Sequence, residues 1–315
     1  MTGLVVRRLV QMPFIILIIY TITFVLAWLI PGNPLEQPEG RRPPPEIAQA
    51  MAAQYHLDDP VTFYFDYLGK ATGISWVLGL HDKPFDFGPS LQHQDQTVNR
   101  ILAGSLPVSI ALGLAALLLA CVIGGTAGVI GAIRPGSLRD SGTLLIALIG
   151  ISLPTFVTGT VLLITFAWLV PIFPVGGWGE LRHIPLPAVT LSLPFAAYIA
   201  RLMRYSMMDT LREDYIRTAR AKGVSGAKIV LRHALRNAAL PVISYLGPAA
   251  AAAMTGSFVV EKVFIVPGIG EHFVEAVLAK DLTMIMGVVL IYSTMLIVFN
   301  LLVDVCAAWL DPRIA

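Results

Sequence analysis

Six long apolar stretches constrain the fold of this 315-residue chain more than any other feature. A transmembrane helix needs about 20 consecutive, mostly apolar residues. Charged residues make up 13% of the chain, whereas about 25% is usual in a soluble domain, and the mean hydropathy is +0.74. We therefore predict an all-α polytopic membrane protein, a single transmembrane domain over residues 1–315. Its six transmembrane helices are expected at about 9–30, 101–133, 143–170, 187–208, 238–260 and 283–310.

The first apolar stretch is expected to stay in the mature protein. Arg7 and Arg8 precede it, but the stretch is too long for the apolar core of a signal peptide, and no A-x-A cleavage site follows. The two cysteines, Cys121 and Cys306, lie inside apolar stretches, so neither a disulfide framework nor a cysteine metal site is expected.

The distribution of charge predicts the orientation. Positive residues concentrate in cytoplasmic loops of membrane proteins. With both termini in the cytoplasm, the cytoplasmic segments hold fourteen of the 22 Lys and Arg residues, while residues 31–98 carry nine acids against four bases. We therefore expect residues 31–98 to form an extracytoplasmic loop region and residues 209–237 a cytoplasmic loop. The net charge of +2 gives no reason to expect nucleic acid as a partner.

The segment RTARAKGVSGAKIVLRHALRN, residues 217–237, has six cations and no acid. Apolar residues before and inside it recur at helical spacing, and Glu213 and Arg217 have the i,i+4 order of a favourable surface pair. Gly223 is expected to end this helix in the left-handed region, and Ser225 to start the next one as N-cap. A basic loop can also be a plain topology signal on anionic lipid headgroups, but that reading does not account for a helix–glycine–helix pattern.

Two strings in this segment resemble the coupling loop of ABC importer permeases of the peptide branch. The chain has DYIRTARAKG from Asp214 and RHALRNAALP from Arg232. Against the general E-A-A loop pattern of these permeases, Ala219, Gly223 and Leu235 match. Further strings similar to the family are PGNP at Pro31, SLPTF at Ser152, EKVFIVPGIG at Glu261 and NLLVDVCAAWLDPRI at Asn300, whereas residues 69–97 depart from its pattern.

The resemblance implies a peptide (dipeptide or oligopeptide) permease subunit of the bacterial cytoplasmic (inner) membrane. A second homologous permease would complete the pore, two ABC ATPase subunits would bind ATP and Mg²⁺, and an extracytoplasmic solute-binding protein would deliver the substrate. The sequence agrees with separate ATPase subunits, because it contains no G-x-x-x-x-G-K-[ST] motif to bind ATP phosphates. The chain itself is therefore not expected to be an enzyme or to bind a cofactor. Contact with the ATPases is then expected at Glu213, Asp214, Arg217, Ala219, Arg220, Lys222, Gly223 and Leu235.

Several alternatives stay open at this point. The family also has branches for nickel chelates, opines and glutathione. An ion-gradient-driven secondary transporter would show internal repeats and several buried charges, but we find no repeat and one acid inside an apolar stretch, Asp304. Gly223-Val224-Ser225-Gly226 spells the G-x-S-G motif of intramembrane proteases, although it lies in a polar, cationic turn.

Other residues have weaker signals. Gly124, Gly128 and Gly131 have the spacing that lets transmembrane helices pack closely. Asp304 is expected to form a structural ion pair with Arg134, Arg139 or Arg201. Pro248 is expected to kink or break its helix. No metal site is expected, because the outer histidines His56, His81 and His93 show no H-x-x-x-H or H-E-x-x-H spacing. Candidates for the substrate pathway are Ser152, Thr155, Thr158, Pro248, Thr255 and Ser257.

Overall fold

The computed structural model describes residues 2–36, 44–93, 95–255 and 257–310. These residues are helical apart from turns, loops and one isolated antiparallel bridge between Pro89 and Thr97. The chain divides into two compact units, each described by itself below. Unit 1 comprises Met1–Val6, Ser109–Pro267 and Leu296–Ala315, and unit 2 comprises Arg7–Val108 and Gly268–Met295.

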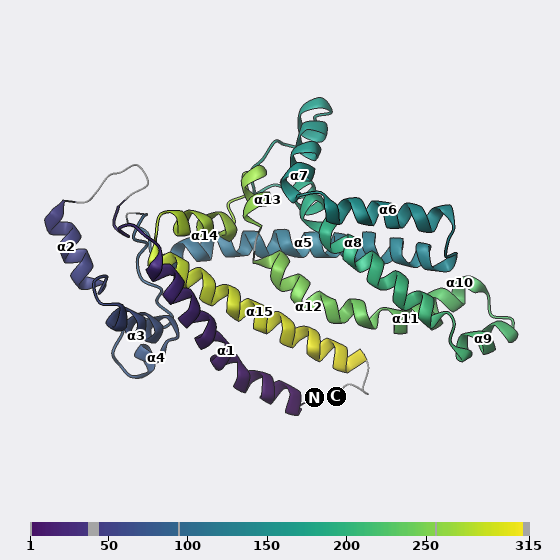
Figure 1. Ribbon diagram of the computed structural model, residues 1–315, viewed down its shortest axis with the longest axis horizontal. Helices are drawn as coiled ribbons and strands as arrows, with labels where there is room; N and C mark the ends of the chain where they lie inside the picture. Colours follow the sequence, from purple (N-terminus) through teal and green to yellow (C-terminus); the bar gives the residue numbers. More distant parts are fainter. Residues whose placement is uncertain (1, 37–43, 94, 256, 311–315) are drawn as a thin grey trace. The chain divides into compact units, whose positions relative to one another are not determined.

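The helices follow one another along the chain as labelled in Figure 1. Two segments, Ile164–Leu169 and Ile229–Ala234, are wound as π-helix, and Leu181–His183 is a short 3₁₀ turn. The α-helices are α1 (Thr2–Leu29), α2 (Pro45–Gln54), α3 (Pro60–Ala71), α4 (Ile74–Val77), α5 (Val98–Ile133), α6 (Leu138–Ser152), α7 (Thr155–Leu163), α8 (Pro185–Thr210), α9 (Asp214–Ala221), α10 (Gly226–Lys228), α11 (Leu235–Ala238), α12 (Leu240–Met254), α13 (Phe258–Val263), α14 (Ile269–Leu278) and α15 (Leu282–Leu310).

The described residues hold four helices that are long and apolar enough to cross a membrane. Two bent helix pairs raise the number to six if each pair is one span. The predicted class, an all-helical protein with several membrane spans, is confirmed. The four helical spans are Val6–Leu29, Val98–Ile133, Leu181–Thr210 and Leu282–Val305.

The third apolar stretch is broken, which the sequence analysis did not predict. α6 ends at Ser152 and α7 begins at Thr155, with a bend of 104° between them. Leu153 has extended backbone torsion angles (φ −84°, ψ 130°) because the ring of Pro154 crowds an α-helical conformation in the residue before it. The SLPTF string therefore separates two helices and is not the middle of one.

The sequence predicts a kink or break at Pro248, but the helix is not broken there. α12 continues from Leu240 through Pro248 to Met254. The chain bends by 51° just before α12. The bend lies between the helical segment Gly226–Ala238 and the first residue of α12, Leu240. Proline is tolerated inside transmembrane helices where the surroundings satisfy the freed carbonyl group.

In unit 1 the glycines of α5 let α8 approach closely, as predicted. α5, α6 and α8 are drawn alongside one another in Figure 1. A Cβ at Gly124 would collide with the carbonyl oxygen of Ala196, and one at Gly128 would lie 2.6 Å from the carbonyl oxygen of Ala200. The α5–α8 contact therefore depends on the absence of these side chains.

A matched pair of glycine substitutions tests this contact. We expect Gly128→Ala to lower the free energy of unfolding by about 1–3 kcal/mol, because the new methyl group forces the two helices apart. Gly125→Ala places the same group in open space, since no atom of the described part of the chain lies within 4 Å of its Cβ position. It should be neutral or slightly stabilising, because alanine favours a helix by up to about 1 kcal/mol. Thermal unfolding in lipid nanodiscs compares the two, and equal midpoints would contradict the close α5–α8 contact.

A buried ion pair ties the start of α6 to α8. The guanidinium of Arg204 binds the carboxylate of Asp140 in a bidentate arrangement, with Nη2 2.8 Å from Oδ2. The Asp140 and Arg204 side chains are only 4% and 13% exposed. Asp140 Oδ2 also accepts the backbone N–H of Gly136, and Ser137 caps α6 by accepting the N–H of Asp140.

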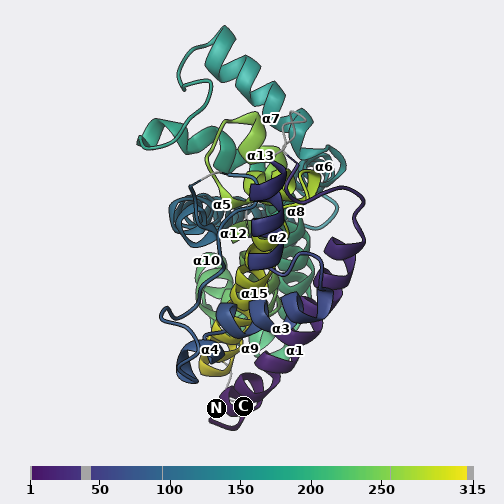
Figure 2. The same cartoon turned by 90° about the vertical axis from the view of Figure 1, so that its left-hand side faces the viewer.

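In unit 2, α1 and α3 lie side by side (Figure 2), and an aromatic cluster joins them. Tyr20 is fully buried and its hydroxyl donates to the carbonyl oxygen of Tyr64 at 2.8 Å. Phe24 stacks on Phe63 with ring centroids 6.0 Å apart. Asp59 caps α3 and Pro60 occupies its first position. The hydroxyl of Thr62, which hydrogen-bonds to the side chain of Asp59, holds the pKa of that carboxyl group below its usual value.

Asp281 fastens a turn of the long insertion to the start of α15. Its carboxylate is 1% exposed and accepts the hydroxyl of Ser90, the N–H of Leu91 at 3.1 Å and the N–H of Met284 at 3.0 Å. The amide nitrogen of Gln92 donates to the carbonyl oxygens of Pro34 and Ala279, both at 2.9 Å. The carboxylate stands at the N-terminus of α15, where negative charge is favoured. This anchored turn, Ser90–Gln92, lies within residues 69–97, where the sequence analysis expected a departure from the family pattern.

Candidate functional site

The candidate site is the basic segment, residues 209–237, in unit 1. α8 ends at Thr210, α9 runs over Asp214–Ala221, and Gly223 follows with φ +77°. The predicted helix–glycine–helix arrangement is confirmed, although the second helix is a short α-helical turn that continues as a π-helical segment. Ser225 holds the N-cap position of α10 with an extended backbone, but no hydrogen bond of its side chain caps the helix.

The basic segment is anchored on an apolar cluster of its own chain. Ile216 of α9 is fully buried, as are Met207 of α8 and Ala234 of the π-helical segment. The hydroxyl of Tyr215 accepts the side-chain amide of Asn237 at 3.0 Å. α9 is therefore held against the residues on both sides of it in the sequence.

The predicted contact residues fall into two groups. Ala219 and Leu235 are half-buried and pack against the same apolar cluster. The others are exposed on α9 and its ends: Glu213, Asp214, Arg217, Arg220, Lys222 and Gly223. The expected pair of Arg217 with Glu213 is wrong, since Arg217 Nη1 lies 3.3 Å from Asp214 Oδ1. Both of these side chains are exposed, so their contact contributes little to stability.

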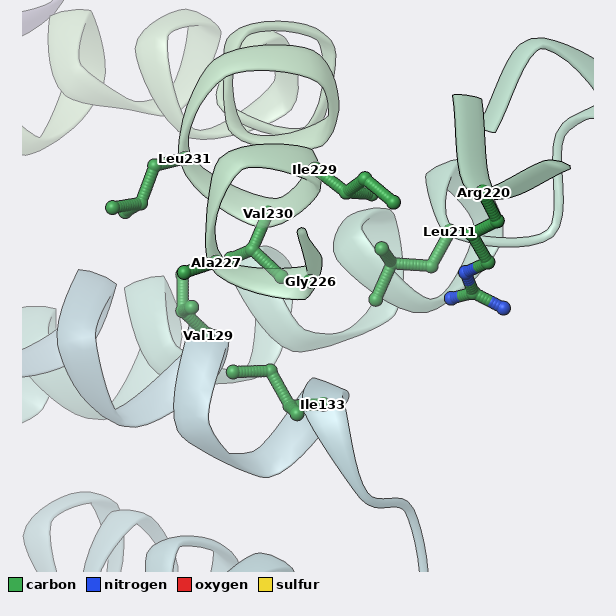
Figure 3. Close-up of a pocket in the computed structure, with 9 residues that line it drawn as sticks. All are labelled: Val129, Ile133, Leu211, Arg220, Gly226, Ala227, Ile229, Val230 and Leu231. Atoms are coloured by element: carbon green, nitrogen blue, oxygen red, sulfur yellow. The ribbon is translucent and has the colours of Figure 1, made fainter. Parts of the chain in front are cut away.

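An apolar pocket of about 380 Å³ opens beside α9. In Figure 3, Leu211 and Arg220 lie on one side of it and Val129 and Ala227 on the other. Arg220 is the only charged residue among those that line it. The arrangement can take up an apolar side chain of another protein and hold an acidic group at its rim.

The predicted pathway hydroxyls mostly bond within their own helices. Thr158 donates to the carbonyl oxygen of Pro154 and Thr255 to that of Ala252, both at 3.2 Å, while Ser257 caps α13. Ser152 and Pro248 are exposed and Thr155 is half-buried. Their role in a substrate pathway stays a prediction.

Most of the buried acids are not predicted from the sequence. The sequence indicates Asp304 as the one acid inside an apolar stretch, but Asp140, Glu261 and Asp281 are all at most 2% exposed. Glu261 accepts the hydroxyl of Ser109 at 2.8 Å. Asp304 is half-buried on α15, and its pairing with Arg134, Arg139 or Arg201 stays a prediction. The neighbouring Ser137 and Gly136 in RPGSLRD, a cap followed by an acid in the first turn, were a signal for Asp140.

Comparison with known proteins decides the family. Residues 124–315 match the family described as "Binding-protein-dependent transport system inner membrane component", and residues 1–113 match the N-terminal part described for the same membrane components. The chain belongs to this family. It is thus a permease subunit of the inner membrane, as the resemblance of the basic segment indicated.

Curated relatives cover the whole chain. The dipeptide transport system permease protein DppB of Bacillus subtilis (strain 168) is 41% identical over 314 residues, which are 100% of this chain and 98% of the relative. The oligopeptide transport system permease protein OppB of Salmonella typhimurium is 41% identical over 318 residues, 100% of this chain and 99% of the relative. Among solved structures, the inward-facing MetNI methionine ABC transporter has a chain with a TM-score of 0.52 and 18% identity, over 69% of this permease and 97% of that chain. At that identity the likeness shows the fold alone.

Proposed function

We propose that this permease is one half of the pore of an ATP-driven importer that carries di- or oligopeptides into bacteria. The observation that carries the proposal is α9, an exposed basic helix that is followed by Gly223 and is held by Ile216 on the chain's own core. The 41% identity over full length to permeases named for dipeptides and oligopeptides supports the substrate class. The concentration of cations supports a cytoplasmic position for the basic segment and for both termini.

The proposed partners follow from this role. A second homologous permease completes the pore, two ATPase subunits bind ATP and Mg²⁺, and a solute-binding protein presents the peptide outside. The ATPase needs a stiff contact to move the pore. Ile216, Ala219 and Leu235 supply the stiffness on the buried side of the basic segment, and Arg217, Arg220 and Lys222 offer charge on the exposed side. Charge of this kind sets the register and the rate of association more than the affinity.

Co-purification from membranes tests the ATPase contact. We expect tagged wild-type permease to bring down two P-loop ATPases and a second permease. The double variant Arg220→Glu with Gly223→Asp should retain the second permease and lose at least about tenfold of the ATPase, because two negative charges replace the cationic end of α9. Among the described residues nothing lies within 4 Å of a Cβ at Gly223, so the new side chain has room, and the strain that any side chain meets at φ +77° is shared by the asparagine control below.

Two matched variants separate charge from folding. Gly223→Asn has a similar size and tolerates the left-handed conformation at φ +77°, so it should keep the ATPase. Arg134→Glu reverses an exposed cation outside the basic segment and should also keep it. Loss of the ATPase in the control variants, or its retention in the double variant, overturns the coupling role. Uptake of labelled dipeptide in cells, with a nickel chelate as comparison, tests the substrate class separately.

A further inference from the structure

Three metal-ligating side chains meet in unit 2, far from the basic segment in sequence. His93 belongs to the turn that Asp281 fastens, and His272 and Glu275 belong to α14. One ligand atom of each lies within 4.8 Å of those of the other two. The rings of His93 and His272 are perpendicular, with centroids 6.3 Å apart. The fold thus brings together side chains that are 179 residues apart.

α14 presents two of the three ligands together. His272 and Glu275 are three residues apart, and residues at this spacing share one face of a helix. His-x-x-Glu is also the spacing by which helices of metal-binding bundles offer a histidine and a carboxylate, there in the order Glu-x-x-His. This pair was not predicted from the sequence, since the histidines considered there, His56, His81 and His93, all lie in the insertion.

The turn that holds the third ligand is built and anchored. The backbone N–H of His93 donates to the hydroxyl oxygen of Ser90 at 2.9 Å, and Ser90 donates to buried Asp281. The side chain of Gln92 donates to the carbonyl oxygen of Ala279, directly after α14. This second layer of hydrogen bonds holds His93 beside α14, as supporting residues do for metal ligands.

His272 is the least exposed of the three ligands. Its Nδ1 is shielded from solvent and has no hydrogen-bond partner in the described residues. A buried polar atom of this kind requires an explanation, and an ion is one of the standard ones.

We propose that His93, His272 and Glu275 form a binding site for one divalent transition-metal ion of the zinc class. Two imidazoles with one carboxylate are a known zinc ligand set with a fourth position left for water or another ligand. Ca²⁺ and Mg²⁺ fit poorly, because they prefer oxygen ligands. A metal–ligand distance of about 2.0–2.2 Å requires the three atoms to draw closer, and the exposed side chains of His93 and Glu275 can rotate to do so. The ion cross-links the anchored turn to α14 and stabilises unit 2 by mass action.

Metal titration of the full-length protein in nanodiscs tests the site. The protein carries no histidine tag and is first treated with chelator. We expect one equivalent of Co²⁺ to give visible absorption bands of a nitrogen-ligated site, and one equivalent of Zn²⁺ to displace it. His272→Gln and Glu275→Gln should each weaken Zn²⁺ binding, measured by competition with a chromophoric chelator, by at least about 100-fold.

A control and a second readout make the outcome decisive. His56→Asn removes a histidine of the same insertion that lies outside the cluster, and it should bind Zn²⁺ as the wild type does. Zn²⁺ should also slow chymotrypsin cleavage at Leu91 in the wild type and not in His272→Gln. The proposal is overturned if wild-type protein shows no stoichiometric Co²⁺ bands, or if the double variant His272→Gln with Glu275→Gln binds Zn²⁺ as tightly as the wild type. The wild-type spectrum decides even if a variant fails to fold.

Discussion

Replacing Asp281 by alanine should open the anchored turn of unit 2. The substitution removes the acceptor for Ser90, Leu91 and Met284 and leaves these donors buried. Each unsatisfied buried donor costs about 1–3 kcal/mol, so we expect a loss of roughly 3–5 kcal/mol after local relaxation. Asp281→Asn should cost less, because asparagine remains a good N-cap for α15.

Protease cleavage at Leu91 measures this opening, since Leu91 is 7% exposed in the closed turn. When opening is fast, the cleavage rate follows the population of the open form. A loss of about 3 kcal/mol corresponds to roughly 100-fold faster cleavage by chymotrypsin. Asp66→Ala is the matched control, because Asp66 forms a half-exposed pair with Lys70 on α3. Equal cleavage rates in both variants would show that Asp281 does not hold the turn.

The second large effect is expected at the ion pair of Asp140 and Arg204. Arg204→Ala leaves the carboxylate of Asp140 buried without its cation, and breaking one side of a buried pair costs about 3–5 kcal/mol. Arg217→Ala removes the cation of an exposed pair and should cost about 1 kcal/mol or less. Thermal unfolding in nanodiscs compares the two variants.

A double-mutant cycle isolates the Asp140–Arg204 contact. Because a lone buried charge is the main cost of each single change, Asp140→Ala with Arg204→Ala should be clearly less destabilised than the sum of the two. Additive losses would mean that the two groups stabilise unit 1 independently. The cycle also tests a residue pair that the sequence analysis did not identify.

Local features of this fold could be predicted from the sequence. The apolar stretches predicted the membrane helices because length and composition alone decide that assignment. Gly223 was predicted correctly because a helix end needs a residue that adopts a positive φ at low cost. Gly124 and Gly128 were predicted correctly because small residues one helical turn apart have few other uses in a membrane helix.

Features that depend on distant residues could not be predicted. Nothing near Asp140 in sequence distinguishes Arg204 from the other cations of the same region, and the two are 64 residues apart. The prolines show the same limit, because Pro107, Pro194 and Pro248 lie inside helices while Pro154 separates two. Whether a proline breaks a membrane helix depends on what satisfies the freed carbonyl group, and those partners come from tertiary packing.

The contact between Asp281 and Leu91 also has a consequence for biosynthesis. Its two ends are 190 residues apart, and a ribosome adds about 5–20 residues per second. Asp281, the acceptor for the turn at Ser90–Gln92, is therefore synthesised roughly 10–40 seconds after the turn itself. During that time the backbone N–H groups of the turn are open to water, chaperones and proteases. A chain truncated before Asp281 never acquires this acceptor, so we expect the turn to stay open in an incomplete permease.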